Sequence, residues 1–169
     1  MSQAKIKIAL VGDGGVGKTS FLKKQLYNVL ESKHVATMGV EVHPINIQTD
    51  KGNIELQFWD CAGVEKYRGL RSGYYIKSDV AVIMIDPKSI LKVPYWVSQI
   101  RETSDCPIIL CSTKKDIQEM KINTDKLIDI VDHVCISSKT NENIDLLLLK
   151  IAKYGMKDKT LSLIKTNEN

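Results

Sequence analysis

One run of eight residues near the amino terminus has the composition of a phosphate-binding loop. It reads Gly12-Asp13-Gly14-Gly15-Val16-Gly17-Lys18-Thr19, after a short apolar segment at 6–11 and before a helical pattern at 20–30. Glycines let the backbone curl so that successive N–H groups point at phosphate oxygens, and the helix start adds the positive end of its dipole. The pattern G-x-x-x-x-G-K-[ST] in this context predicts binding of a nucleotide's phosphates.

Side chains at the end of this loop and farther along the chain could complete a magnesium–nucleotide site. Lys18 supplies a point charge for the β- and γ-phosphates, and the Thr19 hydroxyl can ligate Mg²⁺. Asp60 ends a later apolar strand and can hold the shell of the same ion. Gly63, three residues on, can offer its N–H group to a γ-phosphate. An Asp-x-x-Gly pair is by itself often only a turn, so its weight comes from its place after a strand.

Two further short motifs, each after a predicted strand, favour guanine over adenine. The carboxylate of Asp116 can accept two hydrogen bonds from guanine N1–H and the exocyclic amine, a donor pair that adenine lacks. With adenine this carboxylate, which is expected to be buried, would be left unpaired at a cost in binding free energy. The Lys114 stem can lie along the base plane. The backbone of Ser137-Ser138-Lys139 can donate an N–H to guanine O6. The order and placement of these motifs carry more weight than any one of them.

The elements that must position these residues alternate between strands and helices. Apolar runs predict strands at 6–11, 40–47, 54–59, 80–85, 108–111 and 134–136, and helical spacing predicts helices at 20–30, 95–101 and 144–151. Turn residues at 50–53 join the second and third strands as a hairpin. Such alternation predicts a mostly parallel sheet covered on both faces, with ligands at the carboxyl ends of its strands. Trp96 is expected to pack its helix, and His43 and His133 are expected at the surface or the sheet edge.

Composition restricts the class of protein further. The chain of 169 residues is long enough for one domain, and its net charge of +4 is scattered, so direct nucleic-acid binding is not expected. Its longest wholly apolar run, 80–85, is far shorter than the ~20 residues of a membrane span. The four cysteines lack zinc spacing, which favours a reducing compartment. Ser2 stands where myristoylation needs glycine, and no cysteine follows Cys135, so no lipid anchor is expected.

Three stretches carry a resemblance to a known family. Residues 35–44, 69–76 and 107–111 resemble the two switches and the fifth strand of Ras-superfamily small GTPases, most closely those of the Ran group. The resemblance runs from about Lys5 to Tyr154. It implies a P-loop NTPase fold of the α/β class, with a six-stranded, mostly parallel sheet and five helices. It also implies one G domain over 1–169, with a core at 5–154 flanked by short tails at 1–4 and 155–169.

The resemblance also implies a set of site residues and ligands. GTP and GDP would be bound with Mg²⁺, and Thr37 would cap the ion and the γ-phosphate in the GTP state. The implied catalytic residues are Lys18, Thr37 and Gly63, and the metal ligands are Thr19, Thr37 and Asp60. The implied nucleotide-binding residues are Gly14, Gly15, Val16, Gly17, Lys18, Thr19, Ser20, Thr37, Gly63, Thr113, Lys114, Asp116, Ser137, Ser138 and Lys139.

Partners and location follow only from the resemblance to the Ran group. It implies a guanine-nucleotide exchange factor, a GTPase-activating protein and transport receptors of the importin and exportin type. A monomer found in both nucleus and cytoplasm is expected, working in nucleocytoplasmic transport.

The sequence departs from the family pattern in three places. Val64 stands where the family has the glutamine that orients the attacking water, so hydrolysis is expected to be slow unless a partner supplies the missing group. Thr113 replaces the usual asparagine, and its hydroxyl can still bond the phosphate loop. The Ran group's acidic carboxyl-terminal run and basic patch are missing, the latter from 128–133. Two functions remain open: a transport switch with weak hydrolysis, or a catalytically impaired GTP-binding scaffold.

Overall fold

A six-stranded sheet forms the centre of the protein in the computed structural model, which describes residues 2–28, 40–61 and 73–164. Its strands lie in the order β2-β3-β1-β4-β5-β6, and every neighbouring pair is parallel except the antiparallel hairpin β2–β3. Their bounds are β1 Ala4–Val11, β2 Val40–Thr49, β3 Gly52–Cys61, β4 Val80–Ile85, β5 Ile108–Ser112 and β6 Ile130–Cys135. The predicted α/β class and sheet are confirmed.

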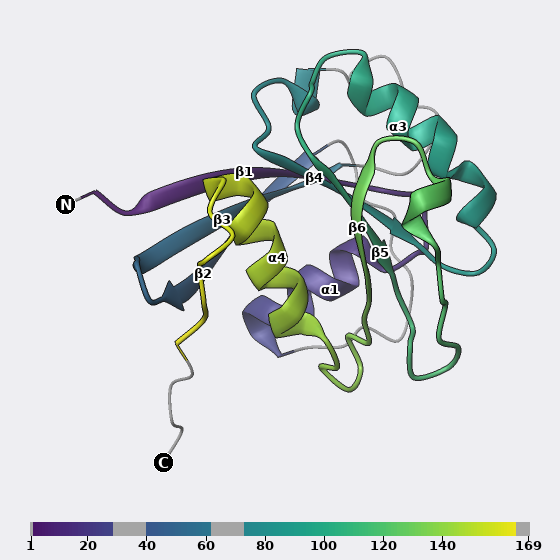
Figure 1. The fold of residues 1–169 in the computed structure, drawn as a ribbon. Helices are drawn as coiled ribbons and strands as arrows, with labels where there is room; N and C mark the ends of the chain where they lie inside the picture. Colours follow the sequence, from purple (N-terminus) through teal and green to yellow (C-terminus); the bar gives the residue numbers. More distant parts are fainter. Residues whose placement is uncertain (1, 29–39, 62–72, 165–169) are drawn as a thin grey trace.

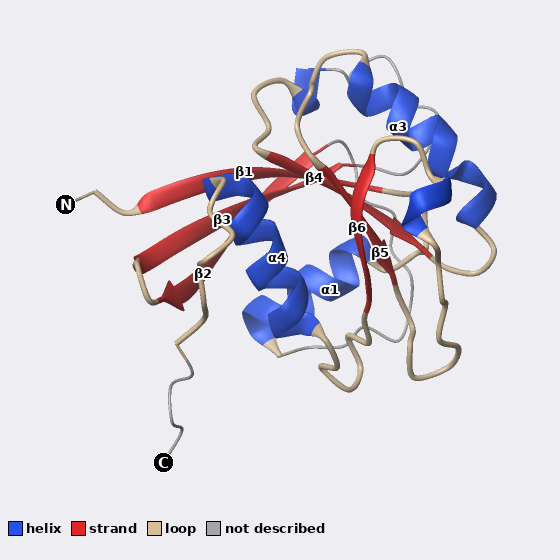
Figure 2. Ribbon diagram, viewed as in Figure 1, coloured by secondary structure: helices blue, strands red, loops and turns tan. Residues whose placement is uncertain are grey.

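Helices cover both faces of the sheet (Figures 1 and 2). Helices α1 (Lys18–Tyr27) and α4 (Ile144–Met156) bury one apolar cluster against it, and α3 (Val93–Arg101) buries a second against the other face. Two 3-10 helices, η2 (Ile90–Lys92) and η3 (Thr124–Lys126), lie in connections. Of the five helices expected, the described residues contain these three α-helices. They also contain no helix long and apolar enough to cross a membrane.

The observed bounds of α1 and β6 differ from the predicted bounds for local reasons. Helix α1 begins two residues before the predicted start and ends at Tyr27, where Asn28 adopts a left-handed φ of 54° and closes the helix. Strand β6 begins at Ile130, four residues earlier than predicted. It is an edge strand, so polar Asp132 and His133 interrupt the apolar pattern without leaving the sheet.

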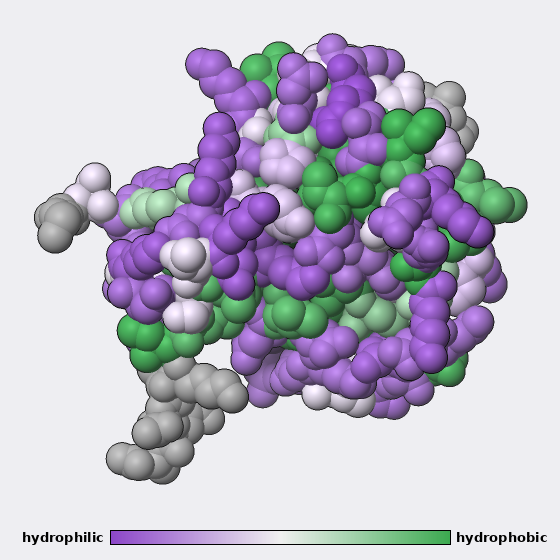
Figure 3. Space-filling model, viewed as in Figure 1, coloured by the Kyte–Doolittle hydropathy of each residue, from purple (hydrophilic) through white to green (hydrophobic). Residues whose placement is uncertain are grey.

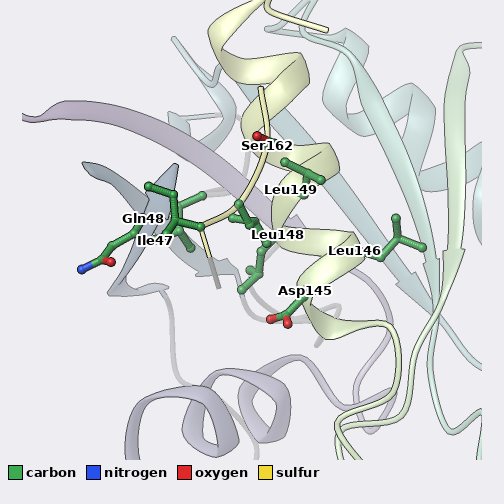
Figure 4. A pocket seen from close by; sticks show the side chains of 9 residues that line it. Ile47, Gln48, Asp145, Leu146, Leu148, Leu149 and Ser162 are labelled. Carbon is green, nitrogen blue, oxygen red and sulfur yellow. The ribbon is translucent and has the colours of Figure 1, made fainter. Parts of the chain in front are cut away.

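The segment after α4 lies against the outer edge of the sheet. Leu163 forms an antiparallel bridge with Thr49, and the N–H of Ile164 donates to Gln48 O at 2.9 Å. Leu161 is 2% exposed and belongs to the core cluster beneath α1 and α4. Figure 4 shows this segment passing beside α4 where it forms one wall of an apolar pocket. The described part of the tail is therefore packed on the domain.

Removing residues 157–169 from the GDP-loaded protein is expected to lower the melting temperature. Burial of one leucine side chain contributes roughly 1.5–3 kcal/mol, and a domain of this size loses about 2–4 °C per kcal/mol. A fall of roughly 3–12 °C is therefore expected in a thermal scan. Leu161→Ala should reproduce most of it while keeping the backbone bonds of Ile164. An unchanged melting temperature in both variants would show that the packed tail does not stabilise the fold.

Candidate nucleotide-binding site

The loop between β1 and α1 has a backbone that only glycine tolerates at its first position. Gly12 has φ 147°, and a Cβ there would lie 2.3 Å from the carbonyl oxygen of Met84. Gly17, with φ 108°, ends the loop immediately before the first residue of α1. Predicted residues Gly14, Gly15, Val16 and Gly17 lie in this loop, and Lys18, Thr19 and Ser20 form the first turn of α1. Local sequence thus creates the curled loop ahead of a helix amino terminus.

Lys18 is held across the loop. Its side chain is 6% exposed, and its ammonium donates to Gly12 O at 2.7 Å and Asp13 O at 3.0 Å. An ammonium in this position can move a short distance to phosphate oxygens above the loop, because backbone carbonyls are weaker partners than anions. The geometry supports the role that the sequence predicts for it.

Asp60 and Thr19 meet where the carboxyl end of β3 faces the start of α1. The Thr19 hydroxyl donates to Asp60 Oδ2, whereas buried Oδ1 has no hydrogen-bond partner among the described residues. Burial raises the pKa of this carboxyl group, and the Thr19 bond and the charge of Lys18 oppose that shift. An ion or its bound water would satisfy the orphaned oxygen and offset the cost of a buried charge. Thr19 and Asp60 therefore fit a Mg²⁺ site.

Two residues that sequence reasoning did not place here lie beside Asp60. The ligand atoms of Glu41, His43 and Asp60 all lie within 4.8 Å of one another, and His43 Nε2 is 3.1 Å from Glu41 Oε2. His43 was expected at the surface or sheet edge. It is on the edge strand β2, but its side chain is only 15% exposed, because it shares a sheet face with Asp60. The two-residue period of β2, with Glu41 paired to Asp60, was the signal that could have placed it.

Replacing Asp60 by asparagine is expected to remove the effect of magnesium on nucleotide release. In the unaltered protein, chelating Mg²⁺ should speed GDP dissociation, because the ion's charge helps to hold the phosphates. In Asp60→Asn, dissociation should already be fast with Mg²⁺ present and should change little on chelation. Stopped-flow release of labelled GDP measures both rates, with the exposed Asp105→Asn as control. Equal magnesium dependence in both proteins would exclude Asp60 from the site.

The loop after β5 is tied directly to the phosphate loop. Thr113 Oγ1 donates to Val16 O at 2.8 Å, which is the bond expected of the threonine that replaces asparagine. Lys114 adopts a φ of 61° and its ammonium lies 3.5 Å from Gly15 O and 3.7 Å from Asp86 Oδ2. These contacts bring the predicted base-recognition motif and the phosphate loop to the same edge of the sheet.

Asp116 lies at the outer side of this loop and is exposed. Its Oδ1 accepts a bond from Ser137 Oγ at 2.7 Å, which joins it to the loop after β6, where Ser138 and Lys139 also lie. The sequence argument treated this carboxylate as buried. In the structure it is open to solvent, so the penalty against adenine arises only once a bound base covers it.

Asp13 and Trp96 form a contact that the sequence did not reveal. The indole N–H of Trp96 donates to Asp13 Oδ1 at 3.0 Å, and Lys92 Nζ lies 3.2 Å from Oδ2. Trp96 was predicted to be a packing residue of its helix, and it is 2% exposed in the cluster under α3. The same side chain thus packs the core and anchors the second residue of the phosphate loop.

Ser112 and His133 form a contact between β5 and β6, next to the base-recognition loop that follows β5. Ser112 Oγ, which is buried, lies 2.8 Å from His133 Nε2, joining the carboxyl end of β5 to β6. Burial lowers the pKa of this imidazole below its usual 6.5; nearby Asp132 opposes the shift and Lys150 adds to it. His133 was expected to be a surface or edge residue, and it is an edge residue with a buried contact.

The lowered pKa of His133 predicts a specific loss of stability in acid. The folded state binds the proton less readily than the unfolded state, so stability is retained above the usual pKa of 6.5 and lost as the pH falls below it. Melting temperature measured from pH 7 to pH 5 should therefore fall less in His133→Asn than in the unaltered protein. Parallel curves for the two proteins would show that this imidazole does not contribute.

Several predicted site residues lie outside the described part of the chain. They are Thr37, Gly63 and Val64. Their assignment to the γ-phosphate and to hydrolysis stays a prediction from the sequence.

Comparison with known families agrees with the loops described above. Residues 7–116 match the family model described as "Ras of Complex, Roc, domain of DAPkinase". The match covers more than half of the chain and includes the phosphate loop, Asp60 and the motif that ends at Asp116. The protein belongs to this Roc family of Ras-like GTPase domains, so it is of the nucleotide-binding, GTPase type.

Proposed function

We propose that the protein is a magnesium-dependent GTP-binding switch whose own hydrolysis of GTP is slow. The observation that carries the proposal is the bond from Thr113 Oγ1 to Val16 O, which fixes the base-recognition loop against the phosphate loop. The loops following β1, β5 and β6 and the carboxyl end of β3 lie at one edge of the sheet, the usual position of ligands in parallel sheets.

Each described residue has a task in binding. Lys18 moves its charge from the carbonyl of Gly12 to the β- and γ-phosphates. Thr19 and Asp60 would hold Mg²⁺, which would neutralise phosphate charge. Asp116, held by Ser137, selects guanine. Thr37 and Gly63, which lie outside the described residues, are assigned from the sequence to the γ-phosphate, whose loss would release both segments.

The slow rate rests on Val64. A valine side chain has no group that can orient a water molecule, while Lys18 and the loop amides still stabilise developing charge. The alternative is a GTP-binding scaffold whose state is set by exchange and by partners. Single-turnover hydrolysis with and without cell extract separates the two. A weak rate that extract accelerates supports the switch, and no hydrolysis under either condition supports the scaffold.

A role in nucleocytoplasmic transport is the finer proposal, and it rests on resemblance alone. Residues 35–44 and 69–76 resemble the switches of the Ran group, which implies an exchange factor, an activating protein, importin- and exportin-type receptors, and a place in nucleus and cytoplasm. Capture of partners on protein loaded with GTP or with GDP tests this role. Transport receptors retained only by the GTP form support it; their absence from both forms contradicts it.

A further inference from the structure

A second cavity lies far from the nucleotide loops. It has a volume of about 520 Å³, within the usual range for small-molecule sites. Its walls come from the residue that precedes β5, from β6, from the second half of α4 and from the segment that follows α4. The lining residues are Pro107, Asp132, Lys150, Lys153, Tyr154, Lys157 and Lys159. Four of these seven residues are lysines.

The charge around this cavity is unbalanced. Lys150 is neutralised by Asp132, whose Oδ1 lies 2.7 Å from its ammonium. Lys153, Lys157 and Lys159 have no carboxylate within ion-pair distance in the parts of the chain that the structure describes. The cavity thus carries an excess of three positive charges. The carboxyl end of α4 contributes roughly half a negative charge, which is too little to balance them.

The walls and the charge together define the ligand's chemistry. Lysine ammonium groups are point charges that suit phosphate oxygens, and the set contains no arginine to grip planar carboxylates in a bidentate manner. Pro107 and the half-buried ring of Tyr154 offer apolar surface on which a ring can rest. The Tyr154 hydroxyl donates to Val131 O on β6 at 3.3 Å, so Tyr154 offers its ring and not its hydroxyl hydrogen to a ligand.

We propose that this cavity binds a ring-bearing molecule with two or more phosphate groups, such as an inositol polyphosphate, either free or as a lipid headgroup. Pro107 immediately precedes β5, so the cavity lies at the amino end of that strand, whereas Thr113 and Asp116 follow its carboxyl end. The ligand would therefore bind alongside a nucleotide and not in competition with it. Hydrophilic side chains cover most of the face shown in Figure 3, so polarity alone does not set this cavity apart from the rest of the surface. Its excess of positive charge does.

Calorimetric titration with inositol 1,4,5-trisphosphate tests the proposal on protein saturated with GDP and Mg²⁺, so that the phosphate loop is already filled. Binding in the micromolar range is expected, weakening as salt screens the lysines. Lys153→Ala/Lys157→Ala should weaken binding at least tenfold. The control Lys88→Ala/Lys121→Ala removes the same charge from exposed positions elsewhere and should change affinity less than twofold. Circular dichroism verifies that both variants are folded.

The proposal would be overturned in the titration by no binding to the unaltered protein, by equal loss in both double variants, or by tighter binding of an acidic peptide than of the trisphosphate. Vesicles identify the source of the headgroup. If vesicles containing phosphatidylinositol 4,5-bisphosphate retain the unaltered protein but not the Lys153→Ala/Lys157→Ala variant, the headgroup comes from a lipid. Binding only of the free compound supports a soluble source. Equal retention on phosphatidylserine vesicles shows unspecific charge attraction and contradicts the proposal.

Discussion

Asp116→Ala is expected to erase most of the preference for guanine over adenine nucleotides. Sites built to pair a polar edge discriminate by about 10⁴-fold against a ligand that lacks it. Asp116 is the carboxylate in the described loops that can accept guanine's two donors, and Ser137 holds it in place through a 2.7 Å bond. Affinities for GDP and ADP, measured by competition with a fluorescent nucleotide, should differ about 10⁴-fold in the unaltered protein and by tenfold or less in the variant.

The matched control for this experiment is Asp105→Ala. Asp105 is also an exposed carboxylate, in the connection between α3 and β5 before the strand begins. Its removal changes net charge equally and should leave the ratio of affinities untouched. Asp116→Ala with an unchanged ratio, or equal affinity for both nucleotides in the unaltered protein, would remove the basis for assigning guanine.

Val64→Gln is expected to raise the rate of GTP hydrolysis. Ras, which has the glutamine, hydrolyses GTP alone at roughly 3–5 × 10⁻⁴ s⁻¹. The protein with valine should be clearly slower and should keep GTP bound for hours, because nothing identified in the sequence replaces the lost group. Single-turnover release of phosphate from GTP-loaded protein measures both rates.

Val64→Ala serves as the control for the change in hydrophobic volume, because it alters the side chain without adding a hydrogen-bonding group. Its rate should stay at that of the unaltered protein. A Ras-like rate in the unaltered protein, with no gain from Val64→Gln, would mean that another residue orients the water. Position 64 would then not be the catalytic defect.

Most of the sheet was predictable because its strands are either fully buried or regularly alternating. β4 has all six residues buried and reads as an unbroken apolar run, so its bounds were predicted without error. The phosphate loop was predictable because its chemistry is local: the glycines, Lys18 and Thr19 are neighbours in sequence. The edge strand β6 was harder to predict from the sequence, because half of its side chains are at least partly exposed and polar residues are tolerated there.

The missed contacts join residues far apart in sequence. Trp96 reaches Asp13 across 83 positions, and Ser112 meets His133 across 21. Helical spacing predicted correctly that Trp96 is packed in the core, but a packing pattern does not reveal which polar atom an indole N–H will find. The exposure of Asp116 was missed for a related reason, since burial there depends on how the loops after β5 and β6 meet.

A thermal scan with added nucleotide tests the central claim most directly. A ligand at 1,000 times its dissociation constant stabilises the native state by about 4.1 kcal/mol, which corresponds to roughly 10 °C for a domain of this size. GDP with Mg²⁺, added to nucleotide-free protein at such an excess, should raise the melting temperature by about that amount. ADP with Mg²⁺ at the same concentration should leave it unchanged. No shift with GDP, or an equal shift with both nucleotides, would contradict the account of this protein as a guanine-nucleotide switch.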